Sequence, residues 1–393
     1  MIFMDISYII NELGEEREKY FNAVSPPIVQ ASNFKLNTVD DLSKAFADEF
    51  NSAQGYVYSR GHNPTVDILR KKLAALDGAE DCLVFNNGAA ATTAAVMANV
   101  KAGDHIVSVE NPYTWTKRLF DVLLSKFNVS CTYIKGTTMQ EWKEASNENT
   151  VFYYLETPNS WTYELQPLKE IAGFARERNI VTLVDNTYCT PIYQNVIEAG
   201  IDMAMQTATK YIGGHSDTLG GVISGTTAMM RKIFESEYMT LGNGISPFNA
   251  WALLRGLRTL PIRLERVIAT TNKVIDFLEA HPAIEKIIFP FHPSFPQYEL
   301  AKQQMKAAMG LITIVLKDPR RDSIVKFCES LHAFLIAVSW GGHESLIMPR
   351  CAGIKKDRFN EANETHKHIR LYIGLEDADY LIKDLEQALN GLN

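Results

Sequence analysis

The stretch AMQTATKYIGGHSDTLGG, residues 204–221, follows a short apolar run and contains a single lysine, Lys210, among small, hydroxyl and glycine residues. The apolar run, residues 201–205, is typical of a buried strand that ends near Gln206. A lysine just after such a strand is either a solvated loop residue or an amine that forms a Schiff base. In the second case, nearby hydroxyl groups and backbone amides would hold an anion. The stretch alone favours neither interpretation.

Short apolar segments alternate with helical segments on the N-terminal side of this stretch. Strands are expected at residues 82–85, 105–109, 129–134, 151–155, 180–184 and 201–205, and helices at 89–99 and 168–178. This alternation predicts an α/β fold with a mostly parallel sheet that is covered on both faces. In such sheets the ligand binds beyond the carboxyl ends of the strands. Gly88, Asp185 and Lys210 all come at or just after strand ends, so we expect them at that edge.

The pattern changes on both sides of this region, which predicts three parts. Residues 1–60 contain breakers such as Pro26 and Pro27, and we expect an extended arm that must pack on something, a neighbouring subunit being one candidate. Residues 61–245 form the α/β domain. Residues 246–393 form a smaller C-terminal α+β domain, with helices expected at 250–257, 263–279, 323–331 and 378–389 and strands at 311–316, 333–338 and 369–373.

Composition restricts the class of protein. The 393 residues carry a net charge of −7, which argues against nucleic acid or an anionic membrane as the main partner. The five cysteines are scattered without a CxxC pair, so we expect neither a disulfide framework nor a metal site. The acidic residues that follow Met4 are not typical of a secretory signal, and no apolar run approaches the ~20 residues of a membrane span. We therefore expect a soluble cytoplasmic protein with a small-molecule substrate.

Asp185 and Lys210 form the first candidate pair. They are 25 residues apart, about one strand–helix–strand crossover, so both can reach the same crevice. A carboxylate that faces a heterocyclic nitrogen, opposite a Schiff-base lysine, is what the chemistry of pyridoxal phosphate (PLP) requires. The alternative for Asp185 is a turn or helix-cap aspartate in the sequence DNT.

Candidate ligands for the phosphate of such a cofactor occur in three stretches. Gly88 and Ala89 begin a predicted helix, whose amides and dipole attract an anion, although a glycine there equally suits a strand–helix turn. Side chains that add hydroxyl, phenol or guanidinium groups are Thr207, Thr209, Tyr58 and Arg60.

Two further residues are candidates for the substrate and the cofactor ring. Arg370 alternates with apolar residues in the strand IRLYIG, and an arginine in a buried strand needs a partner. That partner is either a substrate carboxylate, which a guanidinium binds with two hydrogen bonds, or an acidic side chain of the protein. Tyr113 follows a strand, where its ring either stacks on a cofactor or packs on the core.

Seven motifs, in this order, together resemble a known family. They are YSRGHNPT, NNGAAA, VDNTYCTP, QTATKYIGGHSD, SFPQYELAKQQM, SWGGHESL and IRLYIGLED, and they extend over nearly the whole chain. The chain resembles the Cys/Met-metabolism family of PLP enzymes, of the aspartate-aminotransferase fold type. The resemblance implies a large domain with a mostly parallel sheet, a smaller C-terminal α+β domain, and pyridoxal 5'-phosphate as cofactor.

The resemblance also implies roles for the candidate residues. Lys210 is similar to the Schiff-base lysine, Asp185 to the partner of the pyridine nitrogen, and Tyr113 to the tyrosine that stacks on the ring and assists proton transfer. The phosphate ligands implied are Gly88, Ala89, Thr207 and Thr209, with Tyr58 and Arg60 reaching the phosphate from a neighbouring subunit. That arrangement implies a dimer at least, and usually a homotetramer. Substrate binding is implied for Arg370, on the α-carboxylate, and for Ser339 and Trp340 beside it.

Different motifs are similar to family members that catalyse different reactions. SWGGHESL, GAAA and GHSD are more similar to bacterial cystathionine β-lyases, whereas SRGHNPT and FPQYELAKQQM are more similar to γ-acting members. Trp115 stands where methionine γ-lyases typically carry a cysteine. Ser160-Trp161 stands where many members have an Asn-Pro pair, and Asn159 is a candidate replacement in a shifted turn.

The expected reaction is therefore β-elimination of L-cystathionine to homocysteine, pyruvate and ammonia. The alternative is γ-elimination or γ-replacement, as in cystathionine γ-lyase, cystathionine γ-synthase or methionine γ-lyase. A non-catalytic protein with the same fold is a remote alternative.

Overall fold

A computed structural model describes residues 4–392. The chain divides into two compact units. The first takes in the chain up to Thr157, residues 166–213 and residues 217–258, and the second takes in residues 158–165, residues 214–216 and the chain from Thr259 onward. Among the described residues, no helix combines the length and the apolar character that crossing a bilayer requires.

The first unit is built on a seven-stranded sheet of order β1-β7-β6-β5-β4-β2-β3. Its strands are β1 (Asp81–Phe85), β2 (His105–Val109), β3 (Ser130–Ile134), β4 (Thr150–Glu156), β5 (Val181–Asp185), β6 (Met203–Gln206) and β7 (Gly221–Gly225). Strands β6, β5, β4, β2 and β3 run parallel, so the predicted mostly parallel sheet is confirmed. Strand β7 pairs antiparallel with both β6 and β1, and therefore β1 has the same direction as β6.

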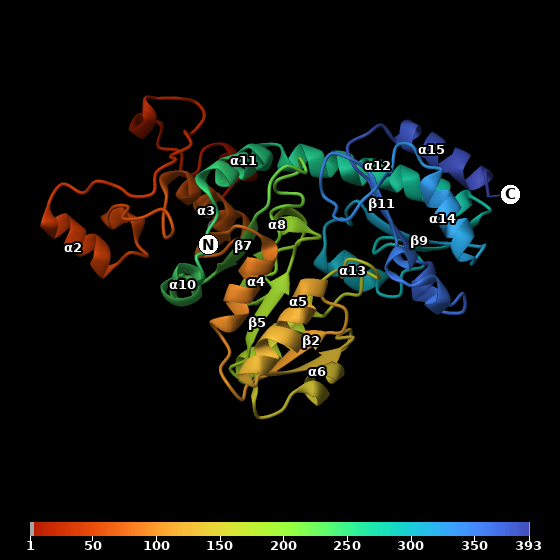
Figure 1. The fold of residues 1–393 in the computed structure, drawn as a ribbon, viewed down its shortest axis with the longest axis horizontal. Coiled ribbons are helices and arrows are strands. Elements are labelled where there is room, and N and C mark those ends of the chain that lie inside the picture. The colour runs from red at the N-terminus through yellow and green to blue at the C-terminus, as the bar shows by residue number, and fades with distance from the viewer. Residues whose placement is uncertain (1–3, 393) are drawn as a thin grey trace. The chain divides into compact units, whose positions relative to one another are not determined.

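Helices cover this sheet; α4 packs against it, and α5 lies beside α4 (Figure 1). The helices of the unit are α1 (Ile6–Asn11), α2 (Val39–Ala47), α3 (Pro64–Asp77), α4 (Gly88–Met97), α5 (Thr114–Arg118), α6 (Met139–Ala145), α7 (Leu168–Glu177), α8 (Thr190–Tyr193), α9 (Thr227–Ile233), α10 (Met239–Leu241) and α11 (Pro247–Arg258). Ala91, Ala94 and Ala95 of α4 are fully buried. Because these side chains are small, α4 packs close to β1, β6 and β7, and its first residue reaches the end of the sheet.

The second unit has a five-stranded sheet of order β10-β11-β12-β9-β8. Its elements are α12 (Leu260–Ala280), β8 (Ile284–Ile288), α13 (Tyr298–Gln304), β9 (Leu311–Leu316), α14 (Arg321–Glu329), β10 (Leu335–Ile336), β11 (Leu346–Pro349), β12 (Ile369–Tyr372) and α15 (Ala378–Asn390). Helix α15 contacts both α12 and α14, and these two also contact the sheet. The predicted strand at 333–338 shrinks to the two exposed residues of β10, an edge strand that pairs with β11 alone.

Helix α3 begins at a local capping signal and is bonded at its end to β6. It starts where the Asn63-Pro64 pair predicts, with the side-chain oxygen of Asn63 accepting from the N–H of Thr65 at 2.9 Å. Its last residue, Asp77, is buried and accepts a hydrogen bond of 2.8 Å from Nε2 of Gln206, the last residue of β6. Burial raises the pKa of Asp77 to about 7.

The Asp77 carboxyl should make stability depend on pH. Its pKa of about 7 in the folded protein lies above its ordinary value of 3.8, so the folded state binds more protons between these values. Asp77 therefore lowers stability as pH rises from 3.8 to about 7. We expect Asp77→Asn to gain thermal stability relative to the wild type between pH 5 and pH 8, measured as the difference in Tm. The exposed Asp322→Asn serves as control. A Tm difference for Asp77→Asn that does not vary with pH would contradict this reading.

Candidate active site

The carboxyl ends of the strands bring the predicted residues of the first unit to one edge of the sheet. Glu156, the last residue of β4, pairs with Asp185 of β5, and Asp185 pairs with Met205 of β6. Strand β1 ends at the same edge because it shares the direction of β6. The residues that follow these strands lie together there: Gly88 after β1, Tyr113 after β2, and Thr207 and Lys210 after β6.

Asp185 is held by its neighbour Thr187, which the sequence did not single out. The Asp185 carboxylate accepts hydrogen bonds from the N–H of Thr187, at 3.0 Å, and from the Thr187 hydroxyl. The same hydroxyl accepts the N–H of Thr207 at 2.8 Å. Thr187 thus joins Asp185, the last residue of β5, to Thr207, the first residue after β6. The turn expected for the sequence DNT is present, and it serves to orient the carboxylate.

Electrostatic interactions connect Asp185 with Lys210 and Tyr113. Burial raises the pKa of Asp185, whereas the bonds from Thr187 and the charge of Lys210 act in the opposite direction. Burial, together with the charge of Asp185, raises the pKa of the Tyr113 phenol. The three groups therefore lie near enough to influence one another. Glu156 fixes the start of the Tyr113 segment, since its Oε2 accepts the N–H of Tyr113 at 2.7 Å.

The first turn of α4 forms an anion cradle with Thr207. A Cβ on Gly88 would lie 2.2 Å from the Thr207 hydroxyl oxygen, so only glycine fits at this contact. The side chain of Asn87 caps Ala90, with an N···O distance of 2.8 Å. Within residues 4–392, the amides of Gly88 and Ala89 donate to no protein acceptor. Two open amides at a helix N-terminus beside a hydroxyl fit a phosphate group.

The backbone around Lys210 is tightly folded. The N–H of Lys210 donates to the carbonyl of Thr207 at 3.0 Å. The Thr209 hydroxyl accepts the N–H of Gly220 at 3.1 Å and donates to its carbonyl at 3.3 Å. This hydroxyl closes the loop from 209 to 220, so its predicted contact with a phosphate stays a prediction.

Tyr58 and Arg60 lie on the exposed surface of the arm. Their side chains interact with each other, the Arg60 guanidinium carbon being 5.3 Å from the centroid of the Tyr58 ring. The Tyr58 side chain is 44% exposed. Both groups are thus available to another molecule.

The second unit collects the residues predicted to bind substrate. Arg370, on β12, is only 7% exposed. Its guanidinium donates to the carbonyls of Ser160, at 3.3 Å, and Ser339, at 3.4 Å. Ser339 has a φ of +84°, a strained backbone conformation for a residue with a side chain. Trp340, next to it, is buried.

Asn159 uses its side-chain oxygen within its own turn. This oxygen accepts the N–H groups of Trp161, at 3.0 Å, and Thr162, at 3.4 Å. The turn thereby presents the carbonyl of Ser160 to Arg370. Two of the residues missed from the sequence, Thr187 and Glu156, carried only a weak signal, a polar residue at or just after a strand end.

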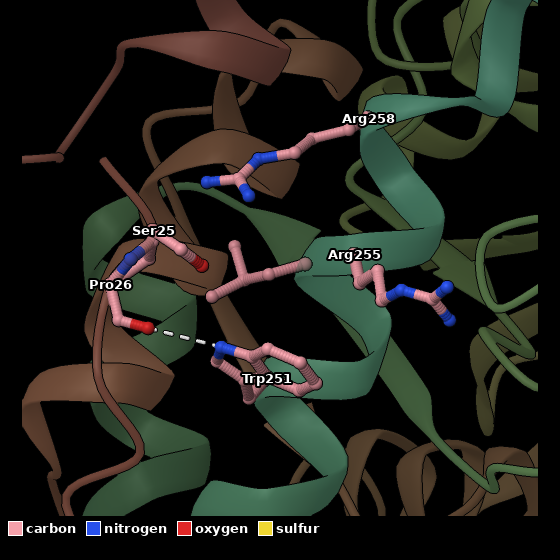
Figure 2. Close-up of a pocket in the computed structure, with 6 residues that line it drawn as sticks. Ser25, Pro26, Trp251, Arg255 and Arg258 are labelled. Atoms are coloured by element: carbon pink, nitrogen blue, oxygen red, sulfur yellow. Dashed lines mark hydrogen bonds between the residues drawn. The ribbon is translucent and has the colours of Figure 1, made fainter. Parts of the chain in front are cut away.

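A separate pocket in the first unit lies between the arm and α11 (Figure 2). Its volume is about 190 Å³, and it is lined by Ser25, Pro26, Trp251, Leu254, Arg255 and Arg258. Nε1 of Trp251 donates to the carbonyl of Pro26 at 3.0 Å, as the dashed line in Figure 2 shows. The lining contains none of the residues gathered at the strand ends, so this pocket is not the candidate active site.

Comparison with known proteins agrees with this geometry. Residues 8–390 match the family described as Cys/Met metabolism PLP-dependent enzyme. An L-methionine γ-lyase from Treponema denticola is 36% identical, over 96% of this chain and 95% of the relative. A cystathionine γ-lyase from Rattus norvegicus is 35% identical, over 96% and 93%. A cystathionine β-lyase from Lactococcus lactis subsp. cremoris is 34% identical, over 96% of both chains.

The fold is shared with a solved structure. The crystal structure of metB from Corynebacterium glutamicum superposes with a TM-score of 0.90, covers 99% of both chains and has 30% sequence identity. The anion cradle at Gly88 and the buried Asp185 near Lys210 are the features that a phosphate and a ring nitrogen need. The chain belongs to the Cys/Met-metabolism family of PLP-dependent enzymes, and its cofactor is pyridoxal 5'-phosphate.

Proposed function

We propose that this protein is a carbon–sulfur lyase that cleaves L-cystathionine by β-elimination. Cystathionine and water give homocysteine, pyruvate and ammonia in this reaction. The observation that carries the proposal is the grouping of Lys210, Asp185 and Tyr113 at the strand ends, next to the anion cradle of Gly88 and Thr207. This set contains an amine, a carboxylate, a phenol and phosphate donors, which a PLP-dependent elimination needs.

The cofactor would be held by residues of the first unit. The amides of Gly88 and Ala89 and the hydroxyl of Thr207 would bind the phosphate, and Asp185 would accept a hydrogen bond from the ring nitrogen. Tyr113 would stack on the ring, and Lys210 would be the point of covalent attachment. When bound, PLP supplies a conjugated ring that accepts the electron pair left on the substrate.

The protein side chains then handle the protons and the charges. Lys210, as a neutral amine, removes the proton from Cα, the role of a general base. The two hydrogen bonds from Thr187 help Asp185 to stay ionised despite its burial. Arg370, fixed by the carbonyls of Ser160 and Ser339, binds the α-carboxylate of the substrate.

Motif similarity favours the β-reaction, because SWGGHESL, GAAA and GHSD are similar to the motifs of bacterial cystathionine β-lyases. Trp115, two positions after Tyr113, is 59% exposed and stands where methionine γ-lyases typically carry a cysteine, which argues only against methionine as the substrate. The alternative is γ-elimination or γ-replacement, in which Lys210 also moves a proton at Cβ. The two γ-lyases described above, which are 36% and 35% identical to this chain, support this second candidate.

We also propose that the enzyme is a cytoplasmic homo-oligomer, at least a dimer and in its usual form a tetramer. Tyr58 and Arg60 would complete the phosphate site of a neighbouring subunit. Their exposure on the arm and their mutual contact support this assignment.

Product analysis tests the reaction. Purified enzyme loaded with PLP is incubated with L-cystathionine, and keto acids and thiols are separated by chromatography. We expect pyruvate and homocysteine in equal amounts. 2-Oxobutyrate with cysteine would replace the β-assignment by the γ-assignment. Absence of turnover with every thioether and homoserine ester would favour a non-catalytic protein.

Replacement of Lys210 tests the catalytic assignment. Lys210→Ala should lose at least about 10²–10⁴-fold in kcat, the range for loss of a general base. After borohydride reduction and proteolysis, the wild-type peptide that contains Lys210 should carry the mass of PLP, and the variant peptide should not. The exposed Lys232→Ala is the matched control. A labelled peptide elsewhere in the chain would refute the assignment.

Mixing two inactive variants tests the shared site. In a dimer of one Lys210→Ala subunit and one Arg60→Ala subunit, one of the two sites has both residues intact if Arg60 acts across the interface. Random mixing should then restore roughly a quarter of the wild-type activity, because half of the dimers are mixed and each has one complete site. Activity equal to the mean of the two unmixed variants would show that Arg60 acts within its own subunit.

A further inference from the structure

Trp161 of the second unit lies against two guanidinium groups. The Cζ atom of Arg370 is 4.8 Å from the centroid of the indole, and that of Arg350 is 4.9 Å from it. Arg350 directly follows β11, whose residue Met348 pairs with Arg370 of β12. The strand pairing therefore places both cations next to one aromatic ring, where each makes a cation–π contact.

Arg350 differs from Arg370 in its surroundings. Its side chain is exposed to solvent, whereas Arg370 is buried and donates to two carbonyls. In the part of the chain that the structure describes, no acidic side chain forms an ion pair with Arg350. A guanidinium has five N–H donors in a planar fork that matches a carboxylate. Arg350 and Arg370 place two positive charges at one ring, and Arg350 has no acidic partner among the described residues. This arrangement favours an anionic ligand.

We propose that Arg350 is a specificity residue that binds a second carboxylate of the substrate, with Trp161 packing along the chain between the two ends. This inference rests on the proposed function, in which Arg370 binds the α-carboxylate. The substrate class is then an amino-acid thioether with a carboxylate at each end. L-Cystathionine belongs to this class, whereas methionine does not.

The distances agree with such a ligand. The two guanidinium carbons are separated by no more than the sum of their distances to the shared ring centroid, 4.8 and 4.9 Å. Seven bonds join the carboxylate carbons of cystathionine, which spans about 8 Å when extended, by the rise of an extended chain. The length of the molecule is thus within this upper limit, so its two carboxylates can face the two guanidinium groups side by side.

Selectivity between substrates tests the proposal. The kcat/KM for thiol release is measured with L-cystathionine and with S-ethyl-L-cysteine, a thioether that has only one carboxylate. Arg350→Met keeps an unbranched side chain, although a shorter one, and removes its charge. We expect the kcat/KM for L-cystathionine, divided by that for S-ethyl-L-cysteine, to fall roughly 10- to 100-fold in this variant. This is the range for loss of a hydrogen bond to a charged group. Arg350→Lys should restore part of the selectivity, and Arg358→Met, at another exposed arginine of the second unit, should leave the ratio as in the wild type.

A binding measurement separates this inference from the proposed reaction. Calorimetry with L-cystathionine on the PLP-loaded Lys210→Ala variant, with and without Arg350→Met, gives the effect on Kd without turnover. Weaker binding of cystathionine, with little change for S-ethyl-L-cysteine, supports the role of Arg350 whichever bond the enzyme cleaves. An unchanged selectivity, or an equal loss for both ligands, overturns it. Failure of the wild type to cleave cystathionine, with selective binding intact, would refute the proposed reaction alone.

Discussion

The hydrogen bond from the N–H of Thr207 to the hydroxyl of Thr187 is the constraint on which the active site depends. It joins the residues after β5 and β6, two neighbouring parallel strands. Because Thr187 also donates to Asp185, the position of the aspartate and the path of the chain toward Lys210 are fixed together. A shift of one strand by a single residue would break this bond and turn the aspartate to the opposite face of the sheet.

Burial of Asp185 sets the second constraint. Removing a carboxylate from water costs several kcal/mol, whereas a hydrogen bond to a charged group contributes about 1.5–3 kcal/mol. The two bonds from Thr187 therefore offset only part of the cost, in agreement with the raised pKa of Asp185. The charge of Lys210 acts in the same direction as these bonds. In the proposed function, the protonated ring nitrogen of the cofactor would be a second cation close to the carboxylate.

The second unit uses a different principle. Arg370, which we propose to bind substrate, is fixed by backbone carbonyls and by the Trp161 ring, and not by its place at a strand end. The carbonyls of Ser160 and Ser339 accept hydrogen bonds from Arg370. Ser339 adopts a strained, positive φ at this contact. Trp161 contacts both Arg350 and Arg370, and under the inference drawn above the segment at 158–165, which departs from the family's usual Asn-Pro pair, would belong to the substrate-binding surface.

The sequence by itself determined the class of fold, the family and the identity of the polar residues at the strand ends, since apolar periodicity and the motif order are properties of the chain alone. It also determined the start of α3, because the Asn63-Pro64 signal is local. Strands β7, β8 and β11 escaped prediction because their pairing with other strands decides them, and no distinctive local pattern marks them. Only the tertiary structure decided that Thr187 also binds the N–H of Thr207, that Thr209 closes a loop, and that Trp161 lies against two arginines. These contacts join residues between 11 and 209 positions apart, and no local pattern encodes which of them the fold will bring together.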